Sequence, residues 1–179
     1  MAAERSFSGS RTASPARERA PTGPADPETT EAMQPRNPDF ERLVRESFAR
    51  QAYMATLGAS LARVAPGEVW IALPVRNGLL QQHGAVHAGA LASVLDSAGG
   101  YAAFTLMPEG AGVVSVEFKL NLLEPARGER IEARARVVRA GRTLTSVAAE
   151  AWAARDGGER LVATFSGTMM CLLGRGVSG

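Results

Sequence analysis

The 179-residue sequence contains a single cysteine, Cys171, so a framework of intramolecular disulfides is excluded. Proteins without disulfides are typical of reducing compartments, and we expect a cytoplasmic protein. No histidine lies near Cys171 in the sequence, which favours a small core thiol on a terminal strand over a nucleophile. The sequence also shows no signal-peptide core and no apolar run long enough to cross a membrane. We therefore expect no membrane partner.

Excess charge of one sign is also lacking, because the 20 basic residues nearly balance the 18 acidic ones and the net charge is only +2. Lys119 is the single lysine, and the other basic residues are arginines. No cluster combines basic with aromatic side chains, as proteins that bind single-stranded nucleic acid do. We therefore expect no nucleic-acid partner. The G-x-S-x-G elbow of many hydrolases, the P-loop and the dinucleotide-binding fingerprint are absent from the sequence.

Large apolar residues are rare in residues 1–36, which are rich in Arg, Ser, Thr, Ala, Pro and Gly. Such a composition cannot bury enough surface to offset the entropy of ordering, and it predicts a disordered N-terminal extension. Residues 37–174 are long and apolar enough to form one domain with a core. We expect residues 175–179 to be a flexible C-terminus.

Apolar residues recur at helical spacing after Asp39, which can cap a first helix that ends near Gly58. Residues 68–75 alternate with a period of two and predict a strand. Residues 87–107 consist almost entirely of Ala, Gly, Ser and large apolar residues. This composition predicts a long helix that is buried nearly all round.

Four more strands are predicted in succession, over residues 113–123, 130–139, 143–154 and 160–173. In the first of them the apolar residues expected on one face are Val114, Val116, Phe118, Leu120 and Leu122, with Ser115 on the other. The chain shows no β-α-β repeats, so a parallel sheet is not expected. This order of elements predicts an α+β fold in which a curved antiparallel sheet wraps around one long helix.

Asp96 is the one carboxylate in the middle of the predicted central helix. Burying an unpaired charge costs several kcal/mol, so a carboxylate kept there either serves a reaction or accepts structural hydrogen bonds. The residues one turn away are small, which lets a thin ligand or another backbone approach Asp96 closely: Ala92, Ser93, Gly99 and Gly100.

From about residue 48 to 172 the sequence resembles the hotdog-fold acyl-CoA thioesterases of the PaaI-like type, which are related to 4-hydroxybenzoyl-CoA thioesterase. The resemblance rests on three segments, QQHGAVHAGALASVLDSAGG, VVSVEFKLNLLEPARG and VVRAGRTL. It implies a hotdog fold, hydrolysis of an acyl-CoA to free CoA and a carboxylic acid, and no cofactor.

The resemblance also implies roles for individual residues. Asp96 would act as general base or nucleophile, and the amide of Ala88, where the family commonly has Gly, would polarise the thioester carbonyl. Gln81 matches an Asn or Gln near the thioester, with a possible shift to Gln82, and Ser115 matches a residue that positions water. The residues expected to bind substrate are His87, Gly89, Gly100, Arg139 and Arg142, the two arginines near the nucleotide of CoA.

The spacing of Ala88 and Asp96 carries a prediction of its own. Eight residues of helix place the two groups roughly 12 Å apart along its axis, too far to act on one carbonyl. If both act on one thioester, Asp96 must come from a second subunit, which predicts a two-fold homodimer. The resemblance implies the same arrangement. The choice between this dimer and a dimer of dimers is left open.

Two other functions stay open at this stage. A hotdog enoyl-thioester hydratase would normally pair its acid with a histidine, and no histidine follows His87. A non-catalytic acyl-CoA binding protein is the other alternative. A metal site is not expected, because His83 and His87 are interpreted as structural and His87 lies roughly 13 Å along the helix from Asp96. The acyl group is left open between aromatic and medium-chain types.

Overall fold

The computed structural model describes residues 33–174. Most of the predicted N-terminal extension, residues 1–32, lies outside the described part, and so does the predicted C-terminus, residues 175–179. The helices are α1 (Phe40–Ala49), α2 (Ala52–Leu57) and α3 (Ala88–Phe104), with a 3-10 turn, η1, at Asn77–Leu79. The strands are β1 (Ser60–Ala65), β2 (Glu68–Pro74), β3 (Ala111–Leu122), β4 (Arg130–Ala140), β5 (Leu144–Arg155) and β6 (Gly158–Leu173). Met33, ahead of the expected boundary at residue 37, is half-buried against the core.

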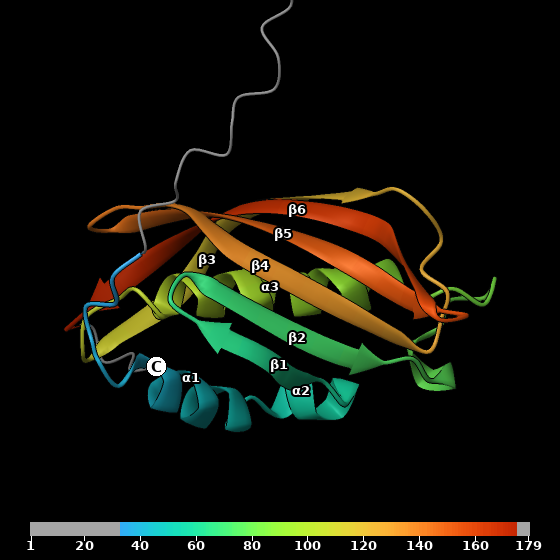
Figure 1. The fold of residues 1–179 in the computed structure, drawn as a ribbon, viewed down its shortest axis with the longest axis horizontal. Coiled ribbons are helices and arrows are strands. Elements are labelled where there is room, and N and C mark those ends of the chain that lie inside the picture. Colours follow the sequence, from blue (N-terminus) through green and yellow to red (C-terminus); the bar gives the residue numbers. More distant parts are fainter. Residues whose placement is uncertain (1–32, 175–179) are drawn as a thin grey trace, which may run out of the picture. The chain divides into compact units, whose positions relative to one another are not determined.

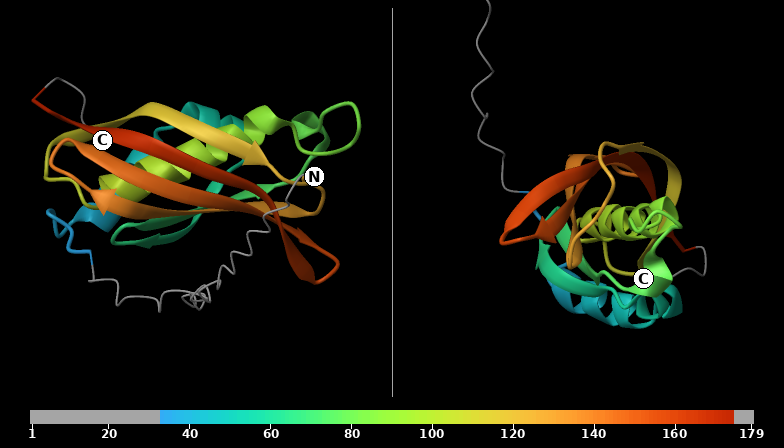
Figure 2. Two further views of the ribbon diagram at one scale, coloured as in Figure 1. Left: turned by 90° about the horizontal axis from the view of Figure 1, so that it is seen from above. Right: turned by 90° about the vertical axis from the view of Figure 1, so that its right-hand side faces the viewer.

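The strands form one six-stranded antiparallel sheet in the order β1-β2-β4-β5-β6-β3. The sheet curves around α3, while α1 and α2 lie along the edge formed by β1 (Figure 1, Figure 2). Alternate strand residues, such as Ile71, Ile131 and Val147, are fully buried between the sheet and α3. The predicted α+β fold, a curved antiparallel sheet around one long helix, is confirmed.

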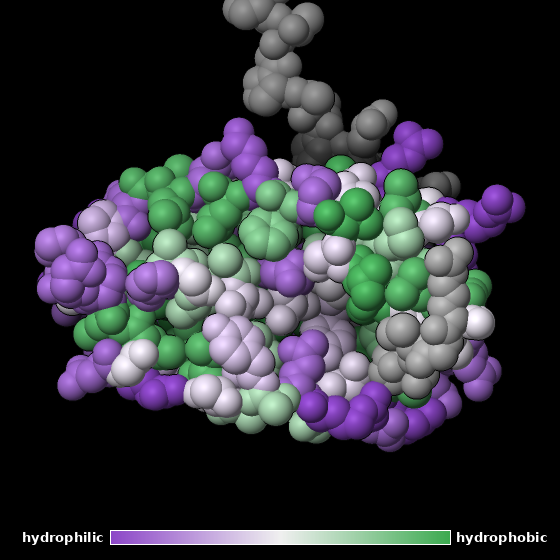
Figure 3. All heavy atoms as spheres, turned by 180° about the vertical axis from the view of Figure 1, so that it is seen from behind, coloured by the Kyte–Doolittle hydropathy of each residue, from purple (hydrophilic) through white to green (hydrophobic). Residues whose placement is uncertain are grey.

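Part of the surface of α3 is left uncovered by the sheet. Ser93, Asp96 and Ser97 are half-buried there, whereas Val94 and Leu95 are fully buried. The prediction of a helix buried nearly all round is therefore wrong, because the sheet encloses only part of the helix circumference. Figure 3 shows the domain from behind, with hydrophobic side chains gathered around a paler region.

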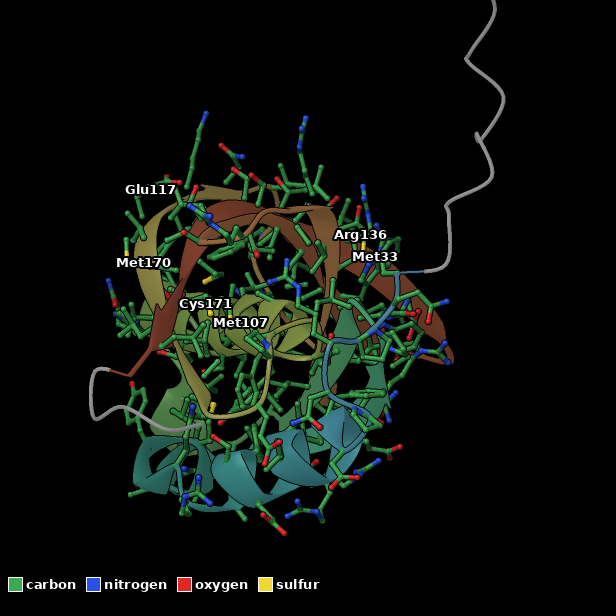
Figure 4. The ribbon with its side chains drawn as sticks, turned by 90° about the vertical axis from the view of Figure 1, so that its left-hand side faces the viewer. Met33, Met107, Glu117, Arg136, Met170 and Cys171 are labelled. Atoms are coloured by element: carbon green, nitrogen blue, oxygen red, sulfur yellow. The ribbon has the colours of Figure 1, made fainter. Side chains whose placement is uncertain are left out.

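The sheet lies close to α3 at Gly99. A Cβ atom on Gly99 would lie 3.1 Å from both Met169 and Val147, so glycine is what permits this contact. On β6, Cys171 and Met170 alternate between the inner and the outer side of the sheet (Figure 4). Cys171 is a free, half-buried thiol that packs against the core. Within residues 33–174 no helix has the length and apolarity that crossing a bilayer requires.

The single helix expected between Asp39 and Gly58 is wrong, because α1 and α2 are separate. Gln51 has an extended backbone (φ −76°, ψ 93°), which interrupts the helical hydrogen bonds before Ala52. Asp39 makes no side-chain capping bond and instead forms an ion pair with Arg42 at 3.4 Å. Gly58 does end α2, in the left-handed conformation (φ 74°) that glycine adopts without strain.

Two β-bulges explain where the strand predictions fail. β1 is not predicted at all, since its side chains do not alternate between buried and exposed and its register shifts between Leu61 and Arg63. In β3 the register shifts between Ser115 and Glu117. The extra residue reverses which face of the strand the following side chains occupy. The prediction that Ser115 and Phe118 lie on different faces is therefore wrong. Both side chains point to the inner side of the sheet, where Phe118 stacks on the buried Phe165 at 5.1 Å.

A cation–π cluster joins four strands on the outer face of the sheet. The guanidinium of Arg134 lies over the rings of Trp70 (4.9 Å) and Trp152 (5.4 Å). It also pairs with Glu132 and Glu159, each at 2.7 Å. The cluster therefore links β2, β4, β5 and β6 on the side away from α3.

Alanine at two adjacent glycines of α3 should have opposite effects on stability. A Cβ on Gly100 would meet no atom within 4 Å, so Gly100→Ala should raise the free energy of unfolding by about 0.4–1 kcal/mol through reduced backbone entropy. Gly99→Ala should lower it by about 1–3 kcal/mol, because Met169 and Val147 must move. Urea denaturation of both variants measures the difference, and equal midpoints would contradict this account of the packing.

Candidate active site

The start of α3 presents one free backbone donor. His87 is the N-cap, and its Nδ1 accepts a hydrogen bond from the Gly89 amide at 2.9 Å. The Gly89 donor is therefore occupied. The Ala88 amide takes part in no hydrogen bond within residues 33–174, and it lies at the positive end of the helix dipole. Ala88 thus offers the donor that an oxyanion would need.

The turn before α3 is held by Gln81 and by Arg127, which was not among the predicted site residues. The Gln81 side-chain oxygen accepts a hydrogen bond from the His83 amide. Gly84 closes the turn with a left-handed backbone (φ 76°). Arg127 donates hydrogen bonds to the carbonyl oxygens of His83 (2.6 Å) and Gly84 (3.1 Å). Arg127 lies more than 40 residues after this turn in the sequence, so no local pattern predicts the contact.

A pocket of about 510 Å³ opens beside the start of α3. Three of the predicted site residues, Gln81, His87 and Ala88, line it together with Leu122 and Leu123 from the end of β3. Gly89 is not among its lining residues. We call this cavity the helix-start pocket.

A second pocket, of about 230 Å³, contains Asp96. The Ser115 hydroxyl donates a hydrogen bond of 2.6 Å to Asp96 Oδ1. Within the described part of the chain no cation pairs with Asp96, and its Oδ2 accepts no side-chain hydrogen bond. Gly100 also lines this Asp96 pocket. The arrangement leaves one carboxylate oxygen available to a water or a substrate.

The Asp96 pocket has a further polar group in Tyr101, whose hydroxyl lies 3.0 Å from Gln51 Nε2 and 3.2 Å from Ser47 Oγ. Burial raises the pKa of the Tyr101 phenol, while its hydrogen bonds to Ser47 and Gln51 act in the opposite direction. Gln51 and Ser47 were not predicted as pocket residues, because the apolar spacing continues through Gln51 as in a single helix.

The predicted site residues therefore fall into separate groups within one chain. The helix-start pocket and the Asp96 pocket share no lining residue, although Ala88 and Asp96 belong to the same uninterrupted helix. Arg139 and Arg142 lie in neither pocket but at the β4–β5 hairpin, exposed and without an acidic partner among residues 33–174. The geometry brings Ser115 to Asp96 but does not bring Ala88 to it.

Metal-binding side chains are not clustered in the described residues: no three His, Cys, Asp or Glu side chains lie close enough together to hold an ion. His83 Nε2 lies 3.3 Å from the Gln82 amide nitrogen, and His87 caps α3. Both histidines thus have structural contacts.

Comparison with known proteins identifies the family. The sequence profile of the thioesterase superfamily matches residues 83–159. A crystal structure of a thioesterase family protein from Silicibacter pomeroyi is 55% identical and covers 75% of this chain and 99% of its own, with a TM-score of 0.75. This chain belongs to the thioesterase superfamily. A protein of Halobacterium salinarum that carries the name esterase is 32% identical over 111 residues, 59% of this chain and 73% of its own.

A further solved superfamily structure is that of a phenylacetic acid degradation-related protein from Ralstonia eutropha. It is 28% identical and covers 73% of this chain and 98% of its own, with a TM-score of 0.64. The hotdog fold expected from the resemblance is confirmed, and so is the interpretation of this thioesterase as a thioester hydrolase.

Removing the His87 cap should destabilise this thioesterase. His87→Ala leaves the Gly89 amide without its acceptor and should lower the free energy of unfolding by about 1 kcal/mol, whereas His87→Asn supplies another capping oxygen and should retain most of it. Chemical denaturation of the two variants checks this. Equal losses for Ala and Asn would show that the imidazole acts through packing instead of capping.

Proposed function

We propose that the enzyme is an acyl-CoA thioesterase in which Asp96 is the general base or nucleophile and the Ala88 amide polarises the carbonyl. The observation that supports this most directly is the 2.6 Å hydrogen bond from Ser115 to Asp96 at the wall of an open pocket. A hydroxyl that donates to one carboxylate oxygen fixes the orientation of the carboxylate. The second oxygen then faces the reacting group.

In the general-base route, Asp96 removes a proton from water as the water oxygen attacks the thioester carbon. The carbonyl oxygen becomes an oxyanion that the Ala88 N–H stabilises. Collapse breaks the carbon–sulfur bond, and the CoA thiolate takes up a proton. In the nucleophilic route, Asp96 attacks the thioester carbon and expels the CoA thiolate, and water then hydrolyses the resulting anhydride and regenerates Asp96. Both routes give a carboxylic acid and free CoA, and Gln81 and His87 line the pocket where the carbonyl would lie.

Both routes require a homodimer, because α3 is continuous from Ala88 to Phe104 and holds the two groups roughly 12 Å apart. Strand β3 is the surface best suited to the contact. It is an edge strand of 12 residues, and an unpaired edge of that length invites pairing with another strand. Val116 and Phe118, 50% and 45% exposed, add apolar surface along it.

A two-fold contact along β3 also gives Arg139 and Arg142 a role. The β4–β5 hairpin lies beside the C-terminal end of β6, since the Cys171 amide donates to the Thr143 carbonyl. Within one chain the hairpin lies at the end of the sheet away from Ala88. Antiparallel pairing of β3 with the β3 of a second subunit would direct the hairpin towards the helix-start pocket of that subunit. The two guanidinium groups, which have no acidic partner among residues 33–174, then suit the phosphates of CoA.

The catalytic assignment is tested by thiol release from a panel of acyl-CoAs, monitored with a chromogenic disulfide. The panel includes aryl groups, because the Ralstonia eutropha relative is named for phenylacetic acid degradation. Asp96→Asn should lower kcat at least about 100-fold, the scale of general-base catalysis. Asp156→Asn is the matched control, since Asp156 is exposed in the β5–β6 turn, and it should retain activity. Binding of acyl-CoA without turnover by the wild-type enzyme would instead indicate a non-catalytic binding protein.

Mixed dimers test whether each site takes one residue group from each subunit. Ala88→Trp should block the helix-start pocket and Asp96→Asn should remove the base, so each homodimer should be nearly inactive. A heterodimer has one doubly damaged site and one intact site, and it should recover towards half of the wild-type activity per dimer. Differently tagged subunits allow the heterodimer to be isolated. An inactive heterodimer of folded subunits would show that Asp96 does not act across the interface.

A further inference from the structure

The helix-start pocket lies between two loops that are distant in the sequence. Residues 81–87 lead into α3, and residues 123–126 follow the end of β3. The Val86 amide donates a hydrogen bond of 2.8 Å to the Ala126 carbonyl oxygen, which joins the two backbones. Arg127, the next residue, lines neither pocket, but its side chain reaches from the second loop to the first. The two walls of the pocket are therefore held together by the Val86 bond and by Arg127.

The guanidinium of Arg127 binds backbone oxygens that have no other partner. The carbonyl oxygens of His83 and Gly84 accept from it at 2.6 and 3.1 Å, and neither accepts another hydrogen bond among residues 33–174. A guanidinium carries several N–H groups in one plane, so it can bind two adjacent carbonyls at once, and its charge strengthens both bonds. Arg127 forms no ion pair within the described residues. Its hydrogen bonds there all go to the loop before α3.

Two glycines make this contact possible. A Cβ atom on Gly84 would lie 3.2 Å from Arg127 Nη1, so the missing side chain gives the guanidinium room to approach. A Cβ atom on Gly128 would collide with the Ala154 carbonyl oxygen. Glycine therefore lets the Glu129 amide bond to that oxygen at 2.9 Å, which anchors the backbone shortly after Arg127. The arginine thus extends from a fixed backbone towards a fixed target.

The loop bound by Arg127 carries the groups that the proposed reaction uses at the carbonyl. The Gln81 amide donates to the Ala85 carbonyl and the His87 amide to the Leu79 carbonyl, each at 2.8 Å, so the loop is folded back on itself. His87 is followed directly by Ala88, whose free amide is the proposed oxyanion donor. A shift of the loop would therefore move Gln81 and the start of α3 together. A misplacement of about 1 Å can lower a catalysed rate about 100-fold.

We propose that Arg127 is a positioning residue of this thioesterase, which holds the loop that places Gln81 and the Ala88 amide and itself contacts neither the thioester nor the nucleotide of CoA. This inference rests on the proposed hydrolysis at the helix-start pocket and adds a residue outside both pockets on which the rate depends. Because Arg127 acts on the geometry around the reacting carbonyl, its loss lowers kcat and leaves KM nearly unchanged. The loss is the same whether or not the substrate carries a nucleotide.

Arg127→Met removes the donors and keeps an unbranched side chain, whereas Arg127→Lys keeps a charged donor. Each variant is assayed with the acyl-CoA that the wild-type enzyme hydrolyses fastest and with the pantetheine thioester of the same acyl group, which lacks the nucleotide. Arg127→Met should lower kcat at least about tenfold on both substrates, with KM unchanged within about threefold. Arg127→Lys should recover at least about threefold of this loss. Arg130→Met is the matched control, because Arg130 is exposed at the start of β4, and it should keep the wild-type kcat.

Three results would overturn the inference and leave acyl-CoA hydrolysis intact. The first is an unchanged kcat in Arg127→Met. The second is a loss that appears as a raised KM for the acyl-CoA and is absent with the pantetheine thioester, which would make Arg127 a nucleotide-binding residue. The third is a smaller yield of folded protein with a normal kcat per folded subunit, which would make the role of Arg127 purely structural.

Hydrogen exchange of backbone amides gives a readout that needs no turnover. In Arg127→Met the Gln81 and His87 amides should exchange at least about tenfold faster than in the wild-type enzyme, whereas the amides of β4 and β5 should keep their rates. Arg130→Met should leave all these rates unchanged. If the wild-type enzyme hydrolyses neither thioester, the proposed function fails and exchange decides the inference separately. Tenfold faster exchange at Gln81 and His87 then supports it, and unchanged exchange overturns it.

Discussion

The rigidity of α3 is the constraint on which the rest of the structure depends. An uninterrupted hydrogen-bonded helix from Ala88 to Phe104 fixes the distance between the free amide at its start and the carboxylate in its middle. The two pockets therefore form along one rod and cannot merge by local adjustment. Any chemistry that needs both groups must bring together two helices, and the unpaired β3 edge is where a second sheet can join the first.

The surrounding sheet places the remaining groups by close packing. Gly99 lets β5 and β6 approach α3 to within contact of Val147 and Met169, which holds the inner strands against the helix. The bulge in β3 then turns Ser115 inward at the level of Asp96. Without the extra residue, the strand would present Ser115 to the outer face, and the carboxylate would lose its hydrogen-bond donor.

The sequence predicts most of the fold because its strongest signals are periodic. The central helix and five of the six strands follow from apolar spacing and turn residues. Asp96 stands out as the one carboxylate in the middle of that helix, whereas the roles expected of Ala88 and Ser115 come from the family resemblance. The features missed are local departures from periodicity. A register shift by one residue leaves the composition of β3 unchanged, so alternation alone assigns its faces incorrectly.

Long-range contacts are the other features that the sequence does not predict. Apolar spacing continues through Gln51 as if one helix ran to Gly58. The extended backbone at Gln51 accompanies the hydrogen bond of its side chain to Tyr101, a residue 50 positions away that local spacing cannot indicate. Arg127 holds the turn before α3 from a loop 43 residues away, through bonds to backbone carbonyls that carry no sequence signature. Both contacts depend on the tertiary arrangement and not on any local pattern.

The cluster on the outer face of the sheet has a consequence for spectroscopy. Trp70 and Trp152, which flank Arg134, are the only two tryptophans in the chain. Both indoles lie on the face opposite α3, so the sheet separates them from a ligand in the Asp96 pocket. Intrinsic tryptophan emission in this enzyme therefore reports the integrity of four strands, and occupancy of the Asp96 pocket needs a probe placed on the other side of the sheet.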